Sequence, residues 1–587
     1  MADRNNYVIS EYQKGYSSFD SSPNLSPSNY PVKAGSMALS TDPRTANQLQ
    51  EVSEKLSTGI KSIEVEGVMP EVFESIPKGH LKEINRLMKL TGAEATFHGP
   101  VIEPSGMSQQ GYDESQRKSA ERKMQLAMER AYELNPKKSS PVTFHSSVQI
   151  PATVIEPTKE GKKEIMLFAA NKETGKFYPL IEEKKHSAGM ENLEKGEIYT
   201  PKQQLEMLNE NEWSNSLDQV FFNKERADEI LNKEGSKIQN FLSDYQKGDI
   251  DMDALRPEQE KVLNKYKTVE TYLGDVHKQI ENFFSKAYEF GNPEQKKYLK
   301  EKSEKFKGEL KKDSTISGQS KAMQNLMNDL YSTTPNMYVP IEEFALDKTS
   351  ETFSNVALDS YKRYKDNAPI VSIENAPYGT VLSSGEDLKK LIDESRKKFI
   401  EKAQEQGISK SEAGKQAEKL IGVTWDVGHI NMMRNRGFGK EEIIEQSKQV
   451  APFVKHVHFS DNFGLEHTEL PMGMGNVPTK EIMEKLGKEG FEAKKVIEAA
   501  HWFQHFKTPP VTESFGAFGS PIYSDGAGPY WNQTTGFSQD YNQGLAGAWL
   551  PQINYETFGA GFSQLSTELG GQKPGTQGSR MSGRPME

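Results

Sequence analysis

The feature that most constrains the fold of this chain is an alternation of short strand-like segments with helix-like segments. Each strand-like segment is a short run of apolar and β-branched residues, and the stretches between them repeat apolar residues at helical spacing. The strand-like segments are 36–41, 62–69, 94–100, 141–147, 370–377, 421–429, 454–461 and 494–500. This alternation predicts parallel βα units.

Eight βα units close naturally into a TIM (β/α)8 barrel, and this α/β fold is the predicted fold class. An open doubly wound sheet is the alternative that the same alternation allows. One of the predicted helices covers residues 386–406, and Ser383 and Glu386 are spaced as a capping box at its start.

The alternation stops after the fourth strand and resumes near residue 340. Residues 163–180 predict a hairpin with Gly175 in its turn. Residues 200–335 predict helices that bury one apolar stripe and expose charged faces. The predicted organisation is therefore a flexible lead (1–34), the first half of the barrel (35–150), a hairpin plus helical insertion (151–340), the second half of the barrel (341–508), and a partly disordered tail rich in glycine, serine and aromatic residues (509–587).

Composition restricts the chemistry that the chain can perform. The 587 residues include no cysteine, so disulfides and thiolate metal sites are excluded and any metal must bind His, Asp or Glu. The formal charge of -11 gives no global electrostatic argument for nucleic-acid binding. The first 30 residues contain no apolar signal segment, and no run of about 18 apolar residues occurs, so we expect a cytoplasmic protein without membrane association.

Residues of the metal-ligand type stand at the ends of six consecutive predicted strands. Active sites of TIM barrels form at the C-terminal ends of the strands, so these side chains share one rim. There, carboxylates and imidazoles would repel or lose solvation unless cations compensate them. The strand-end residues are His98, His145, Glu374, Asp426 with His429, His458 and Glu498, and the loop after the seventh strand adds His467 and Glu469. Eight or nine ligands exceed one coordination shell, which predicts a divalent-metal centre with more than one ion.

His456 belongs to the same predicted strand as His458. We expect it on the opposite face of that strand and interpret it as structural.

Six short motifs stand at these strand ends, and their order is as informative as their composition. They are TFHGP, TFHSS, SIENAPYG, TWDVGHINM, HVHFSDN with LPMGMGN, and VIEAA. Together they resemble the xylose isomerase-like TIM-barrel superfamily, which includes the endonuclease IV family of apurinic/apyrimidinic endonucleases. The resemblance is closest to the endonuclease IV branch. It covers about 35–150 and 340–500, and the 151–340 insertion is foreign to it.

The endonuclease IV-like branch implies up to three divalent ions, with zinc as the expected metal. The resemblance places the first ion on His98, His145 and Glu374. It places the second among Glu374, Asp426, His458 and Glu498, and the third on His429 with two residues of the loop after strand seven. The implied function is a DNA-repair hydrolase that cleaves abasic DNA, with a metal-bound hydroxide attacking phosphorus. The abasic nucleotide would be flipped into the barrel mouth.

The loop after strand seven departs from the family pattern, which has Asp, one residue and His before a glycine pair. Counted back from Gly473 and Gly475, this chain has His467, Thr468 and Glu469, so the order of acid and imidazole is reversed. Both remain competent ligands, but a third ion would have a different geometry.

Two alternatives remain open. Sugar isomerases and epimerases of the superfamily hold one Mn²⁺ or Mg²⁺ with the equivalents of Glu374, Asp426, His458 and Glu498. In such an enzyme Glu374 and Glu498 would be catalytic and would shuttle the proton of a small sugar substrate. The second alternative is a non-enzymatic scaffold that binds a protein partner through the 200–335 helical insertion and the aromatic tail.

Overall fold

The computed structural model describes residues 37–159, 161–186, 196–252, 255–499, 502–503, 506–511 and 514. The predicted lead (1–34) lies outside these residues, and so does the predicted tail (509–587) apart from 509–511 and 514. The chain separates into two compact units, one formed by Met1–Glu164 with Ile341–Glu587 and the other by Ile165–Pro340.

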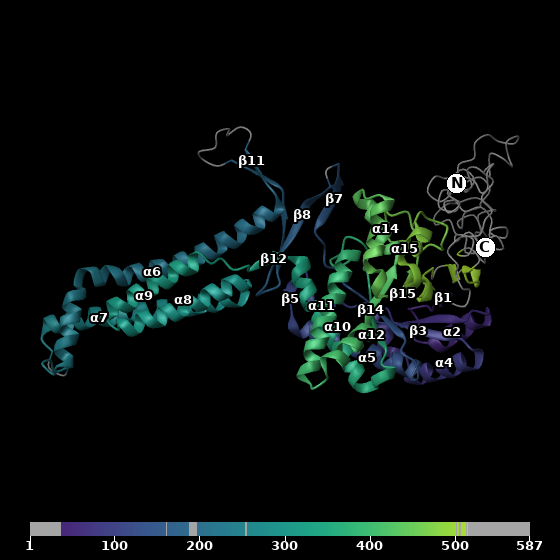
Figure 1. The fold of residues 1–587 in the computed structure, drawn as a ribbon, viewed down its shortest axis with the longest axis horizontal. Coiled ribbons are helices and arrows are strands. Elements are labelled where there is room, and N and C mark those ends of the chain that lie inside the picture. Colours follow the sequence, from purple (N-terminus) through teal and green to yellow (C-terminus); the bar gives the residue numbers. More distant parts are fainter. Residues whose placement is uncertain are drawn as a thin grey trace, which may run out of the picture. The chain divides into compact units, whose positions relative to one another are not determined.

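The first unit contains a closed barrel of eight parallel strands, which confirms the predicted TIM barrel and excludes the open sheet (Figure 1). Neighbouring strands follow chain order, and the last strand closes on the first through the pairs Met37↔Lys495 and Leu39↔Ile497. The barrel strands are β1 (Met37–Ser40), β2 (Ser62–Glu66), β3 (Glu94–His98), β6 (Pro141–His145), β13 (Ile370–Glu374), β14 (Ile421–Asp426), β15 (Val454–Phe459) and β16 (Lys494–Ile497).

Amphipathic helices surround the barrel and cover the outward side chains of its strands. Trp425, for example, is fully buried and donates a hydrogen bond of 3.1 Å to Ser447 Oγ on a covering helix. The helices are α2 (Gln48–Ser57), α3 (Pro70–Ser75), α4 (Lys78–Thr91), α5 (Glu114–Leu134), α10 (Ile341–Tyr364), α11 (Gly385–Glu405), α12 (Lys410–Leu420), α13 (Val427–Asn431), α14 (Lys440–Val450) and α15 (Thr479–Glu492). The remaining elements of this unit are β4 (Met107–Ser108), β5 (Gly111–Tyr112), β7 (Val154–Thr158), η2 (Lys365–Asn367), η3 (Met432–Arg436) and η4 (Ala451–Phe453).

The barrel interior is polar, because side chains that alternate inward along these strands are hydroxyls and ligand-type groups. Thr143 and Thr424 share a hydrogen bond of 3.0 Å, and Thr424 donates another of 2.7 Å to Ser372. One step further along the strands, Glu374 stands in register with His145, and Asp426 with His458. Because of this strand register, the ligand-type residues lie at the same level, at the C-terminal end of the barrel.

The start of α11 corrects one local prediction. The N-cap is Ser384 rather than Ser383, and its hydroxyl accepts a hydrogen bond of 3.1 Å from the Asp387 backbone N–H. Ser383 donates to the Thr380 carbonyl instead. Both serines are followed three residues later by an acid, so the sequence offers two equivalent capping registers.

The second unit has its own core and confirms the predicted helical insertion. Its helices are α6 (Pro201–Gln246), α7 (Pro257–Phe290), α8 (Pro293–Lys312) and α9 (Ile316–Tyr331). They enclose a cluster of buried side chains that includes Trp213, Leu217, Leu273, Val276 and Met327. The strands associated with this unit are β8 (Gly161–Asn171), β9 (Phe177–Ile181), β10 (Glu183–Lys185), β11 (Glu197–Tyr199) and β12 (Tyr338–Pro340).

The predicted hairpin is formed by β8 and β9, which pair antiparallel. Gly175 in the connecting turn has a φ of 65°, a backbone conformation that glycine adopts at low cost. Among the described residues, no helix combines the length and the apolar character needed to traverse a lipid bilayer.

Candidate metal centre

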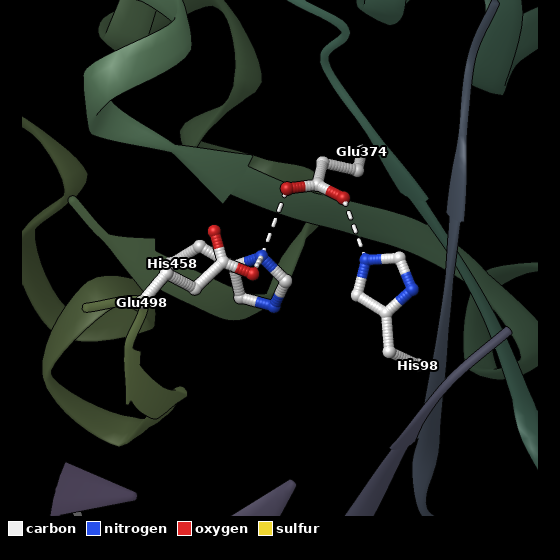
Figure 2. A group of neighbouring side chains, drawn as sticks. All are labelled: His98, Glu374, His458 and Glu498. Carbon is white, nitrogen blue, oxygen red and sulfur yellow. Dashed lines mark hydrogen bonds and ion pairs between the residues drawn. The ribbon is translucent and has the colours of Figure 1, made fainter. Parts of the chain in front are cut away.

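Glu374, at the end of β13, lies at the centre of a buried cluster at the barrel mouth (Figure 2). Its Oε2 atom lies 3.2 Å from His98 Nε2 and 3.1 Å from His145 Nε2. Its Oε1 atom lies 2.8 Å from His458 Nδ1. One carboxylate thus contacts imidazoles from three other strands, so each of its oxygens faces a separate set of ligand-type nitrogens.

Glu498 follows β16 and approaches the same side of His458. Its Oε1 atom lies 2.9 Å from His458 Nδ1. The ligand-type residues His98, Glu374, His458 and Glu498 each offer one ligand atom within 4.8 Å of the others. Figure 2 shows these four side chains together. This spacing is compatible with all four groups holding one ion.

Asp426 and His429 extend the cluster along the rim. Asp426 caps the short helix α13, and its Oδ1 accepts a hydrogen bond of 2.7 Å from the His429 backbone N–H. Its Oδ2 atom is buried and has no hydrogen-bond partner among the described residues. His429 Nδ1 lies 2.7 Å from the Asn375 carbonyl, which can only accept, so Nδ1 carries the proton. His429 Nε2 is then the atom available to a ligand.

The loop after β15 brings a further imidazole to this atom. His467 Nε2 lies 2.7 Å from His429 Nε2. Glu469 is partly buried in the same loop, and burial, followed by the charges of Asp426 and Glu374, raises its pKa to about 7. His467 therefore lies at the barrel mouth, and a metal-binding role for His467 and Glu469 stays a prediction.

Asp461 explains how this loop is held. Its carboxylate accepts hydrogen bonds from the backbone N–H groups of Gly473 at 2.9 Å and Val477 at 3.1 Å. A Cβ atom at Gly475 would lie 2.3 Å from Asp461 Oδ1, so only glycine fits there. The glycine pair of the LPMGMGN motif is thus needed for folding the loop back over the mouth.

The pKa values of the cluster diverge strongly. Burial opposes the charged form of Glu374, but His458 and His145 hold its pKa well below its usual range. The pKa of His98 is raised to about 10, because Glu66 and Glu374 outweigh the effect of burial. Burial, together with Glu498 and Glu374, raises the pKa of Asp426 well above its usual range. Carboxylates close together in a dry site compete for compensating charge, which a cation supplies.

The residues present fit a divalent metal. The donor set is imidazole nitrogen and carboxylate oxygen, which suits zinc, manganese, iron or magnesium. The unpartnered Asp426 Oδ2 is a buried acceptor atom of the kind that a cation would satisfy.

Comparison with known proteins places this centre in a family context. Residues 366–509 match the model of a family described as "Xylose isomerase-like TIM barrel". The resemblance to the xylose isomerase-like superfamily is confirmed. The matched segment contains β13, β14, β15 and β16, and therefore Glu374, Asp426, His458 and Glu498.

Two individual proteins are also similar to this chain. An uncharacterized protein of Methanocaldococcus jannaschii is 34% identical over 80 residues, which are 14% of this chain. The chain spans about a quarter of that relative, 26% of its length. The crystal structure of a D-tagatose 3-epimerase-like protein aligns with 84% of this chain and 98% of its own, at 13% identity and a TM-score of 0.37.

The barrel of this chain carries two buried carboxylates that sequence reasoning missed. Glu64 and Glu66 both face inward from β2. Glu64 lies 3.1 Å from His458 Nε2, and Glu66, Glu64 and Glu498 offer ligand atoms within 4.8 Å of one another. The alternation of acids in the SIEVE segment is the signal that could have revealed them, since residues two apart on a strand share a face.

The expectation that His456 faces away from His458 was wrong for the same reason. Both residues are fully buried, and both contact Glu64, with His456 Nδ1 lying 3.6 Å from Glu64 Oε1. His456 also lies 3.3 Å from the Thr143 hydroxyl, below the level of the mouth. Burial, partly offset by Glu64, lowers the pKa of His456 to about 4, so this imidazole is neutral near pH 7.

Proposed function

We propose that this chain is a divalent-metal-dependent phosphodiester hydrolase that resembles endonuclease IV and acts on abasic DNA. The observation that carries the proposal is the contact of 2.7 Å between His429 Nε2 and His467 Nε2. This contact adds a further nitrogen site at the mouth beyond the four-residue group around Glu374 and His458. Ligand-type groups then outnumber what one ion binds, which favours the multinuclear branch of the superfamily.

The proposed ligand sets are those that the resemblance to endonuclease IV implies, and the contacts of the Glu374 carboxylate with three imidazoles support part of them. His98, His145 and Glu374 Oε2 would hold one zinc ion. Glu374 Oε1, Asp426, His458 and Glu498 would hold a second. His429 and His467, with Glu469, would hold a third. Bound zinc ions would activate water and neutralise charge developing on a phosphodiester.

The chain's own residues would prepare the mouth for this reaction. Asp426 fixes the start of α13 and so the position of His429. The Asn375 carbonyl accepts a hydrogen bond from His429 Nδ1–H, which leaves His429 Nε2 facing the mouth. Asp461 holds the loop that carries His467 and Glu469. These bonds exist within the protein alone, so substrate would meet a preorganised site.

A second candidate is a single-metal sugar isomerase or epimerase. One observation favours it: Glu374 and Glu498 both approach His458 Nδ1, at 2.8 and 2.9 Å. Four groups including these two carboxylates suffice for one ion. A carboxylate pair beside one metal is also suited to moving a proton between adjacent carbons of a sugar.

The test is cleavage of a DNA duplex that contains a single abasic site, by protein reconstituted with zinc. We expect strand cleavage by the unmodified chain and a loss of at least 100-fold in the His467→Ala/Glu469→Ala double variant, because even residues that only orient metal ligands are worth about 10- to 100-fold in activity. Glu466→Ala is the matched control, since Glu466 is an exposed acid of the same loop.

Three other outcomes would contradict either the hydrolase or its assignment of His467 and Glu469 as ligands. Conversion of a sugar that survives the double variant would support the isomerase. If Glu466→Ala reduces cleavage as much as the double variant does, the loss would come from the charge of the loop rather than from the proposed ligands. Absence of both activities in metal-loaded protein would favour the non-enzymatic scaffold.

A further inference from the structure

Glu64 lies directly beneath the proposed metal centre. It is fully buried in β2, and its Oε2 atom lies 3.1 Å from His458 Nε2. Its Oε1 atom accepts a hydrogen bond of 3.2 Å from the Thr96 hydroxyl. The carboxylate is therefore held by the barrel interior, on the side of His458 away from the mouth.

The two nitrogens of His458 face two different carboxylate environments. Nδ1 lies 2.8 Å from Glu374 and 2.9 Å from Glu498, both of which are proposed metal ligands. Nε2 faces only Glu64 among these acids. The Nε2 contact is an ion pair and not a linear hydrogen bond, since neither atom has a hydrogen-bond partner among the described residues.

We infer that Glu64 is a positioning residue that makes Nδ1 the metal-binding atom of His458. Histidines that bind metals commonly direct their other nitrogen to a carboxylate, which fixes the ring and the tautomer. Here the negative charge of Glu64 keeps the proton on Nε2 and leaves the Nδ1 lone pair for the ion. This inference rests on the proposed metal centre, but it assigns a role to a residue outside the predicted ligand set.

A simpler interpretation is that Glu64 only contributes negative charge to a histidine-rich cluster. Glu66 separates the two interpretations, because it lies two residues along the same strand, is also buried, and also faces inward. No ion pair joins Glu66 to His458 among the described contacts, whereas Glu64 contacts the ring directly. A general charge effect would make Glu64 and Glu66 equivalent, and a positioning effect would not.

The experiment compares Glu64→Gln with Glu66→Gln in the full-length chain. Zinc affinity is measured by competition with a chromophoric chelator, and the His458 nitrogens are observed by ¹⁵N NMR of zinc-loaded, ¹⁵N-histidine-labelled protein. The His458 signals are assigned by their loss in His458→Gln. Circular dichroism of each variant establishes that it is folded.

The inference predicts that zinc binds Nδ1 of His458 in the unmodified chain. In Glu64→Gln, zinc affinity should fall by about 10- to 100-fold, the usual effect of removing a carboxylate that orients a ligand. The Nδ1-bound signal should weaken in parallel. Glu66→Gln removes a carboxylate that lies near Glu498 but forms no ion pair with His458 among the described residues, so its Nδ1-bound signal should be retained even if its zinc affinity falls.

Equal losses of the Nδ1-bound signal in the two variants would overturn positioning in favour of general charge, and unchanged affinity in Glu64→Gln would overturn any role. Zinc bound through Nε2 in the unmodified chain would also overturn it. If the unmodified chain binds no zinc, the proposed function itself fails. That result differs from failure of the inference alone, in which the unmodified chain binds zinc and Glu64→Gln binds it equally tightly.

Discussion

Arg117 on α5 offers the sharpest test of how the barrel's outer helices are held together. Its guanidinium is buried, at 2% exposure, and donates two hydrogen bonds of 2.8 Å to Glu114 and one of 2.9 Å to Glu121. It also donates a hydrogen bond of 3.1 Å to Thr352 Oγ1 on α10. Because α10 precedes β13 in the chain, with only η2 between them, this contact links α5 to the helix that leads to the strand carrying Glu374.

The expected cost of Arg117→Met follows from the exposure of each partner. Glu114 is 43% exposed, so its contacts are close to the surface-pair value of about 0.2–1 kcal/mol. Glu121 is only 18% exposed, and Thr352 is buried, so their charge-assisted bonds contribute nearer to about 1.5 kcal/mol. Methionine keeps most of the apolar stem. We therefore expect a loss of about 2 kcal/mol in the free energy of unfolding, below the about 3–5 kcal/mol of a fully buried broken pair.

The assay is guanidinium-induced unfolding of the full chain, followed by tryptophan fluorescence, with Arg122→Met as control. Arg122 is an exposed arginine on the same helix, so its replacement should change the free energy by less than about 0.5 kcal/mol. A loss below about 0.5 kcal/mol for Arg117→Met, equal to that of the control, would refute the reasoning.

The same pair predicts a pH dependence. Hydrogen bonds from Arg117, opposed by partial burial, lower the pKa of Glu114 from 4.5 to about 2. A depressed carboxyl pKa adds stability above the unfolded value, and this stability is lost as the pH falls through the folded value. The difference in stability between the unmodified chain and Arg117→Met should therefore be constant from pH 7 to pH 5 and should shrink between about pH 4.5 and pH 2. A difference that grows on acidification would contradict this account.

Three further predictions concern the insertion and the metal centre. A fragment of residues 200–335 should fold cooperatively alone, as judged by circular dichroism melting, because its helices enclose their own core; a non-cooperative melt would contradict this. In that fragment Trp213→Ala should cost about 3–5 kcal/mol of unfolding free energy, since Trp213 is 4% exposed and donates to the Leu330 carbonyl; a cost below about 1 kcal/mol would contradict the packing. Zinc at 100 times its dissociation constant should stabilise the full chain by about 2.7 kcal/mol for each bound ion in thermal unfolding, and Glu374→Gln should lose most of this effect; a full zinc effect in that variant would remove Glu374 from the centre.

The barrel could be predicted from the sequence because its strands are short apolar runs with helices between them, and the ligand-type residues stand at strand ends. The residues that face the barrel interior below the mouth were harder to predict. Glu64 and Glu66 alternate with apolar residues, a pattern equally typical of a strand with one solvated face. Only the closure of the sheet into a barrel shows that the face carrying these two acids points toward the barrel axis. His456 was misplaced although its spacing of two from His458 requires a shared face.

Other details depended on choices that the sequence leaves equivalent. Ser383 and Ser384 both precede an acid by three residues, and packing selects Ser384. The helix α12 was not predicted at all, since few apolar residues mark its stripe in KSEAGKQAEKL. His467 could be placed at the mouth only through its loop, whose path is set by the Asp461 hydrogen bonds to Gly473 and Val477.

The measurement that tests the central claim most directly is the metal content per chain of protein purified without chelator, by elemental analysis, beside the His467→Ala/Glu469→Ala double variant. The account predicts about three zinc ions per chain, falling to two in the variant, because His429 and His467 lie 2.7 Å apart and would share the third ion. One ion per chain, unchanged in the variant, would contradict the multinuclear centre and leave the sugar isomerase, and a chain without metal would contradict both enzymes.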